Sequence, residues 1–269
     1  MEFLCCFYMP VACGGRYSAT PVVLEPAVIV ALPVAPPVVM STIGSAKRAA
    51  PEVRILVIGQ SIASNCNEKV YGPSPNVFQV GLSGEIRAAS DPFDWADCKR
   101  GSIWMPLGKL LIDTGRASKV TFMPIGSGGT SVADWQEGGR AYAKLNSAIG
   151  VIRQGRIQFD YAFWYQGSSD FGTSHSVYAS RLNSVIAYIT KSVKIKRFLI
   201  STHSRCFGIW DRDIEAAQLD VIRAAQGKIF LGANSNSLDH SYRFDTCHLN
   251  FRGQEEMARL WLEAMENAK

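Results

Sequence analysis

Residues 53–61 read VRILVIGQS, a mostly apolar, β-branched run that ends in a glycine, a glutamine and a serine. A short apolar run of this kind predicts a buried strand, and the glycine allows the chain to turn tightly after it. Four further runs of the same type follow along the chain, at residues 119–125, 159–165, 197–202 and 228–231. Together these runs predict five short strands.

The segments between the strands carry apolar residues at helical spacing. They cover residues 101–116, 141–153, 174–193, 211–225 and 250–267. Strands that alternate with helices pair in parallel through right-handed crossovers. This predicts an α/β fold, a three-layer α/β/α sandwich with a central, mostly parallel five-stranded sheet. Ligands of such sheets bind outside the carboxyl ends of the strands, so the residues that follow each strand are the candidates for function.

The composition excludes several classes of protein. The chain has 269 residues, of which 47% are hydrophobic and 19% are charged, which excludes an intrinsically disordered chain, a collagen-like repeat and a multi-pass membrane protein. The net charge of +5 is spread without a basic run, which argues against nucleic acid as a partner. The seven cysteines lack C-x-x-C or zinc-ligand spacing, so we expect no metal site and no disulfide framework, although the sequence allows a single bridge.

Residues 1–50 differ in composition from the rest of the chain. They are apolar and rich in proline, and no charge lies between Glu25 and Lys47. The start of the chain lacks the basic region of an export signal, and four prolines interrupt the uncharged stretch that would otherwise be long enough to span a membrane. We therefore expect an N-terminal tail or targeting segment over residues 1–50 and one folded domain over residues 51–269. The sequence leaves open whether the segment associates with a membrane and whether the protein is cytoplasmic or exported.

Polar residues follow three of the predicted strands and precede the last helix. They are Gly59-Gln60-Ser61, GSGGTS at residues 126–131, QGSSD at residues 166–170 and DTCHL at residues 245–249. The fold would bring these segments to one edge of the sheet, where they supply the parts of a serine hydrolase: a nucleophile, oxyanion donors, a base and a carboxylate that orients the base.

Ser61 is the candidate nucleophile and His248 the candidate base. Asp245 lies three residues before His248, a spacing that lets its carboxylate reach Nδ1 of the imidazole and leaves Nε2 for the serine. Other roles are open for each residue, because a serine after a strand often caps a helix and an aspartate in a turn often bonds its own backbone. His203, at the end of the fourth predicted strand, is the rival base.

Three groups could stabilise an oxyanion: the N–H of Ser61, the N–H of Gly128 and the side-chain amide of Gln166. Further candidates for contact with substrate are Gln60, Trp135 and Tyr165. Turn formation or core packing would equally explain these residues. Asp170 is better interpreted as a structural cap than as a second catalytic acid. The glycine-rich turn lacks both the G-x-x-x-x-G-K-[ST] and the G-x-G-x-x-G spacing, so we set phosphate binding aside.

The four segments together resemble the SGNH (GDSL-like) hydrolase superfamily, and within it the sialate O-acetylesterase and carbohydrate acetylxylan-esterase branch. That branch has Gly-Gln-Ser where other members have Gly-Asp-Ser, a Gly-Gly-Thr-Ser turn followed by tryptophan, Trp-His-Gln-Gly-Glu with a later aspartate, and Asp-x-x-His-Leu. This chain departs from the pattern at three positions. Ile62 replaces the asparagine after the nucleophile, with Asn65 the nearest substitute, and Tyr165 and Ser168 replace the histidine and the glutamate.

The resemblance covers about residues 53–265 and implies a flavodoxin-like SGNH hydrolase fold. It implies hydrolysis of acetyl esters on sugars through an acyl-enzyme, with no metal or cofactor. Ser61, His248 and Asp245 would form the triad, and Ser61, Gly128 and Gln166 the oxyanion hole. The expected partner is an acylated carbohydrate or another small ester. Two alternatives stay open: a hydrolase or acyltransferase for lipid or small-molecule esters, and a non-catalytic carbohydrate-binding protein on the same scaffold.

Overall fold

The computed structural model describes residues 49–269, so the expectations for residues 1–48 lie outside the described part of the chain. The main sheet has seven strands in the order β3-β2-β4-β1-β5-β6-β9. All neighbouring pairs are parallel except β2 and β3, which form an antiparallel hairpin. The strands are β1 (Glu52–Gly59), β2 (Val77–Val80), β3 (Ile86–Ala88), β4 (Lys119–Gly126), β5 (Phe159–Tyr165), β6 (Ile195–Thr202) and β9 (Ile229–Asn234).

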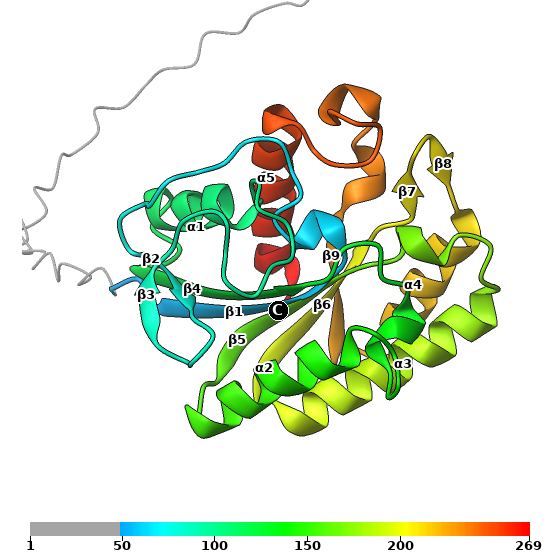
Figure 1. The fold of residues 1–269 in the computed structure, drawn as a ribbon, viewed down its shortest axis with the longest axis horizontal. Coiled ribbons are helices and arrows are strands. Elements are labelled where there is room, and N and C mark those ends of the chain that lie inside the picture. The colour runs from blue at the N-terminus through cyan, green and yellow to red at the C-terminus, as the bar shows by residue number, and fades with distance from the viewer. Residues whose placement is uncertain (1–48) are drawn as a thin grey trace, which may run out of the picture. The chain divides into compact units, whose positions relative to one another are not determined.

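Helices cover both faces of the sheet, as Figure 1 shows. On one face lie α1 (Trp104–Asp113) and α5 (Phe251–Asn267), and on the other lie α2 (Tyr142–Gln154), α3 (His175–Ser192) and α4 (Arg212–Ala224). The predicted three-layer α/β/α arrangement is therefore confirmed. Within residues 49–269, no helix combines the length and apolarity needed to cross a membrane.

Aromatic side chains fill the core on both faces of the sheet. Beneath α1 and α5, the rings of Phe163 and Trp261 stack with their centroids 4.0 Å apart, and Trp104 packs 6.2 Å from each of them. On the opposite face, Trp135 and Trp164 meet edge to face at 6.0 Å. Such burial removes a large apolar area from water, which is the main term that stabilises the fold.

The prediction of five strands was incomplete. The five predicted runs correspond to β1, β4, β5, β6 and β9, but β2 and β3 extend the sheet beyond β4. These two strands have only four and three residues, and all three residues of β3 are exposed, so neither produces a recognisable apolar run. A separate two-stranded hairpin of β7 (Arg205–Cys206) and β8 (Ile209–Trp210) is shorter still.

The expectation of no disulfide framework was wrong. Residues 49–269 contain two bridges, Cys66–Cys98 and Cys206–Cys247, which join residues 32 and 41 positions apart. Loops that are distant in sequence meet at the carboxyl edge of the sheet, and spacing along the chain carries no information about such pairs.

Candidate active site

Close packing at the end of β1 places the candidate nucleophile at the edge of the sheet. Gly59 pairs with Gly126 of β4 and with Tyr165 of β5, so the ends of three parallel strands meet there. A Cβ atom at Gly59 would lie 2.1 Å from the Tyr165 carbonyl oxygen, so only glycine fits. The chain then turns through Gln60 into the short 3-10 helix η1 (Ser61–Ala63), where Ser61 is 8% exposed.

Asp245 and His248 form the predicted carboxylate–imidazole pair. Asp245 Oδ2 lies 2.6 Å from His248 Nδ1, and Oδ1 accepts hydrogen bonds from the backbone N–H groups of His248 at 2.6 Å and Cys247 at 3.1 Å. Burial opposes ionisation of Asp245, but the hydrogen bonds and the nearby imidazole outweigh it and lower the pKa of its carboxyl group. The carboxylate therefore fixes the tautomer in which Nδ1 carries the proton and Nε2 is free to act as a base.

His248 Nε2 is buried and has no hydrogen-bond partner among residues 49–269, so no Ser61–His248 hydrogen bond is formed. The side chain of Asn67 nevertheless places the segments of Ser61 and His248 next to each other. Asn67, which is fully buried, donates from Nδ2 to the Ile62 carbonyl in the nucleophile turn at 3.0 Å. Its Oδ1 accepts from the N–H of Leu249, the residue directly after His248, at 3.1 Å. One amide thus connects the segment of Ser61 to the segment of His248.

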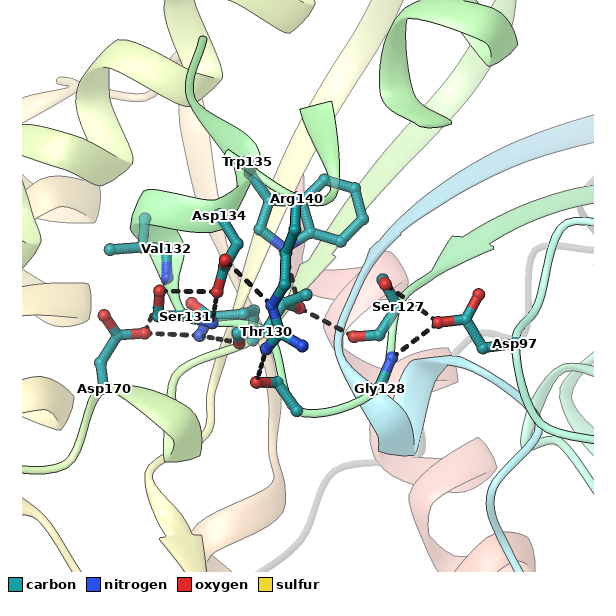
Figure 2. Close-up of polar contacts among 12 residues, drawn as sticks. Asp97, Ser127, Gly128, Thr130, Ser131, Val132, Asp134, Trp135, Arg140 and Asp170 are labelled. Carbon is teal, nitrogen blue, oxygen red and sulfur yellow. Dashed lines mark hydrogen bonds and ion pairs between the residues drawn. The ribbon is translucent and has the colours of Figure 1, made fainter. Parts of the chain in front are cut away.

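The N–H of Gly128, a candidate oxyanion donor, is occupied by a carboxylate. It donates to Asp97 Oδ2 at 3.0 Å, and Ser127 Oγ donates to the same oxygen at 2.9 Å. Figure 2 shows Ser127 and Gly128 facing Asp97. Burial disfavours the charged form of Asp97, but Lys144 and these hydrogen bonds outweigh it and lower the pKa of the carboxyl group. Asp97 would have to release this N–H before Gly128 could bind an oxyanion.

The amide of Gln166, the other candidate donor, is fully buried and both of its donor positions are used. Nε2 donates to the Thr130 carbonyl at 2.9 Å and to Asp170 Oδ2 at 2.6 Å. The same Asp170 oxygen accepts from the Val132 N–H at 2.8 Å, at the far end of the glycine-rich turn from Asp97 (Figure 2). The structure therefore places Gln166 and Asp170 beneath the turn as its supports, and Gln166 is not free to bind an oxyanion.

The three expected substrate contacts are buried. Gln60 is 2% exposed, and its amide bonds to the turn after β5 through Ser168 Oγ and the Gly167 N–H. Trp135 is 1% exposed, packs on Trp164 and donates from Nε1 to Thr130. Tyr165 is fully buried against Trp261. These side chains support the site from below, and the expectation that they touch substrate is not supported by the structure.

His203, the rival base, is also fully buried. Its Nδ1 lies 2.7 Å from Ser235 Oγ, which itself donates to the Thr202 carbonyl at 3.2 Å. Burial is the main cause that lowers the pKa of His203 to about 3, and the Arg243 and His248 side chains lower it further. A neutral imidazole inside the core, with no carboxylate beside it, is less suited to general-base catalysis than His248.

Arg243 is a buried residue of the site that no sequence pattern singles out. Its guanidinium donates to the carbonyls of Ser235 at 3.1 Å and Leu238 at 3.2 Å, and also to the carbonyl of Cys247. The last contact holds the loop between Asp245 and His248. Among residues 49–269, no group of three or more histidine, cysteine, aspartate or glutamate side chains could hold a metal ion.

The comparison with protein families assigns the chain. A model described as "Carbohydrate esterase, sialic acid-specific acetylesterase" matches residues 57–267. The chain belongs to this family. It is therefore a carboxylic-ester hydrolase, and the resemblance to the sialate O-acetylesterase branch is confirmed. The comparison with curated proteins found no match.

Solved structures with similar folds include further esterases. A protein from Arabidopsis thaliana has a TM-score of 0.64 and 15% identity, over 81% of this chain and 100% of that chain. A family 3 carbohydrate esterase from Clostridium thermocellum has a TM-score of 0.54 and 12% identity, over 80% and 96%. Axe2, an acetylxylan esterase from Geobacillus stearothermophilus, has a TM-score of 0.53 and 14% identity, over 81% and 95%. At such identities the likeness concerns the fold, and it agrees with the three-layer architecture of this esterase.

Proposed function

We propose that this esterase hydrolyses acetyl esters of carbohydrates with Ser61 as nucleophile, His248 as base and Asp245 as the residue that orients the base. The single observation that carries the proposal is the Asp245–His248 pair, with Nδ1 held at 2.6 Å and Nε2 left without a partner. Asn67 supports it, because its amide connects this pair to the nucleophile turn.

In the first half of the reaction, Ser61 Oγ attacks the carbonyl carbon of the acetyl group while His248 Nε2 takes the hydroxyl proton. The carboxylate of Asp245 stabilises the imidazolium that results. The N–H groups of Ser61 and Gly128 are the donors available for the oxyanion of the tetrahedral intermediate, once Asp97 has released Gly128. The intermediate collapses when His248 gives its proton to the sugar oxygen, which leaves as an alcohol and leaves an acetyl-serine behind.

In the second half, His248 Nε2 removes a proton from a water molecule, which attacks the acetyl-serine. The second tetrahedral intermediate expels Ser61 Oγ, which recovers its proton from His248, and acetate is released. His248 Nε2 therefore accepts and returns one proton in each half of the cycle, so the base must remain accessible to both the serine and the leaving group. The Ser61 hydroxyl and Nε2 have to come within hydrogen-bond distance for the reaction, since the two are not hydrogen bonded in the structure.

The proposal predicts the effect of removing the hydroxyl. Ser61→Ala should lower kcat for p-nitrophenyl acetate by about 10⁴-fold or more, because no acetyl-enzyme can form. Acetate release from an acetylated sugar should fall equally. Ser184→Ala is the matched control, since Ser184 is exposed on α3 and bonds only to its own helix backbone. Full activity of the Ser61 variant would exclude this mechanism.

A further inference from the structure

The β7–β8 hairpin is attached directly to the loop that carries the base. The disulfide Cys206–Cys247 holds the two Cα atoms 4.4 Å apart, and Cys247 is the residue before His248. Phe207 follows Cys206 at the tip of the hairpin. Since consecutive Cα atoms are about 3.8 Å apart, the Cα atoms of Phe207 and His248 can be no more than about 12 Å from each other. Figure 1 shows this hairpin beside the segment that leads into α5.

Phe207 occupies a backbone position that does not suit it. It has φ +51° and the next residue, Gly208, has φ +76°, so both central residues of this two-residue turn are left-handed. Turns of this kind favour asparagine, aspartate or glycine, and a bulky side chain with positive φ is strained. The ring is also 69% exposed, so its burial does not compensate for the strain. Neither local conformation nor packing explains a phenylalanine here.

The other aromatic residue of the hairpin, Trp210, already has partners within the protein. The Arg212 guanidinium lies 3.2 Å from the centroid of the Trp210 ring, and that of Arg205 lies 5.4 Å from it. Trp210 Nε1 also donates to Glu215 at 3.0 Å. Trp210 therefore anchors the end of the hairpin opposite its turn. The ring of Phe207 has no aromatic or cation–π partner among the described residues.

A second exposed ring lies on the segment that contacts the foot of this hairpin. Phe171, which follows Asp170 after β5, is 63% exposed. The next residue, Gly172, donates its N–H to Asp211 Oδ2 at 3.0 Å, directly after Trp210. Exposed apolar rings thus occur on two segments at the carboxyl edge of the sheet, where ligands of such sheets bind.

We propose that Phe207 is a specificity-determining residue that packs its ring against the sugar ring of the ester being cleaved; this inference rests on the proposed function. A sugar ring presents a face of C–H groups that gains by leaving water against an aromatic ring. The strain and the exposure of Phe207 are then the cost of presenting a rigid apolar surface beside the base. The disulfide keeps the Cα atoms of Phe207 and His248 within about 12 Å of each other, so a sugar on the ring and the scissile ester at His248 can be held together.

The test separates binding of the sugar from chemistry and from folding. Asparagine fits the turn better than phenylalanine but offers no ring, so Phe207→Asn should keep or raise Tm. We expect it to raise KM for glucose pentaacetate roughly fivefold to tenfold with kcat unchanged, and to leave kcat/KM for ethyl acetate unchanged. Phe207→Tyr keeps an aromatic ring and should have the same KM for glucose pentaacetate as the unaltered chain. Leu82→Asn is the control, since Leu82 is 58% exposed in the β2–β3 turn. It should change the KM and kcat/KM for neither substrate.

Each other outcome overturns the inference. An unchanged KM for glucose pentaacetate in Phe207→Asn would show that the ring does not contact the sugar. An equal loss on both esters would show that the hairpin acts through the position of His248 rather than through the sugar. Both results would leave the proposed function standing. If the unaltered chain hydrolysed neither glucose pentaacetate nor ethyl acetate, the proposed function would be overturned, and this inference with it.

Discussion

At the scale of single residues, the side chain of Asn67 connects the turn that contains Ser61 to the loop that contains His248. Asn67→Ala would leave the Ile62 carbonyl and the Leu249 N–H buried without partners, and each such group costs about 1–3 kcal/mol. We expect the free energy of unfolding, measured in urea, to fall by about 2–4 kcal/mol. We also expect kcat/KM for p-nitrophenyl acetate to fall about tenfold or more, because Ser61 and His248 would lose their shared support.

The exposed Asn183 on α3 offers the control for this change. Asn183→Ala should leave both stability and activity nearly unchanged, because alanine is the better helix former and no buried partner is lost. If Asn67→Ala behaved like this control, the connection between the two catalytic segments would have to be carried by other contacts.

Asp97 is a second residue at which a substitution tests the proposed mechanism. Its carboxylate accepts from the Gly128 N–H, so a negative charge lies where the oxyanion needs a donor. Asp97→Asn keeps a carbonyl acceptor for the turn but removes the charge. At about 4 Å one such repulsion is worth about 1 kcal/mol in a water-exposed site, so we expect kcat/KM for p-nitrophenyl acetate to rise about fivefold.

A matched change on the same loop is Asp94→Asn, which breaks an ion pair with Arg87 away from Gly128. It should leave kcat/KM unchanged. A fall in activity for Asp97→Asn, with this control unaffected, would mean that the ion pair between Asp97 and Lys144 is needed to hold the turn, and that the carboxylate is not a competitor of the oxyanion.

Sequence reasoning identified Asp245 and His248 because their contact is local. The carboxylate and the imidazole are three residues apart, and a turn suffices to join them. The role of Asn67 could not be predicted, because its partner Leu249 is 182 positions away and nothing in a single sequence marks that pair. The position chosen as nearest substitute, Asn65, instead bonds to Asp91 at 3.0 Å, away from the nucleophile. Local chemistry was thus predictable, whereas support across the fold was not.

At the scale of elements, prediction succeeded where burial is continuous. β5 begins and ends at the predicted residues, and α5 begins one residue later than expected because Asn250 caps it through Gly253. These elements are long, and one full face of each is apolar, so the period of the pattern is clear. The elements missed, β2, β3, β7 and β8, have only two to four residues each, and β3, β7 and β8 contain no buried residue.

The same short elements carry loops to the active site, and covalent links restrain them. Cys66 lies just after η1 and joins the loop of Asp97 through Cys98, while Cys206 joins the β7–β8 hairpin to Cys247. In the chain-entropy description, closing loops of 32 and 41 residues stabilises the folded state by about 4 kcal/mol per bridge. Loops with few buried apolar residues can therefore hold catalytic groups in place.

At the scale of the whole molecule, buried polar groups make stability depend on pH. His203 is fully buried, and its pKa is lowered to about 3 from an unfolded value of 6.5. Above pH 6.5 the imidazole is neutral in both states, so this group contributes no pH dependence there. Below pH 6.5 the unfolded chain binds a proton that the folded chain does not bind until the pH approaches 3. The free energy of unfolding should therefore fall as the pH is lowered through this interval, by about 1.4 kcal/mol per unit for this one group.

His203→Asn removes the titration and keeps a donor for Ser235, which isolates the contribution of this histidine. We expect the difference in unfolding free energy between the unaltered chain and the variant to change by about 1.4 kcal/mol per pH unit between pH 6 and pH 4, always to the disadvantage of the unaltered chain at lower pH. His240→Asn, at an exposed position, should show no such change. Urea unfolding at a series of pH values measures all three proteins. A constant difference across the series would mean that His203 gains a proton in the folded core, and that the interior beneath the catalytic edge is open to water.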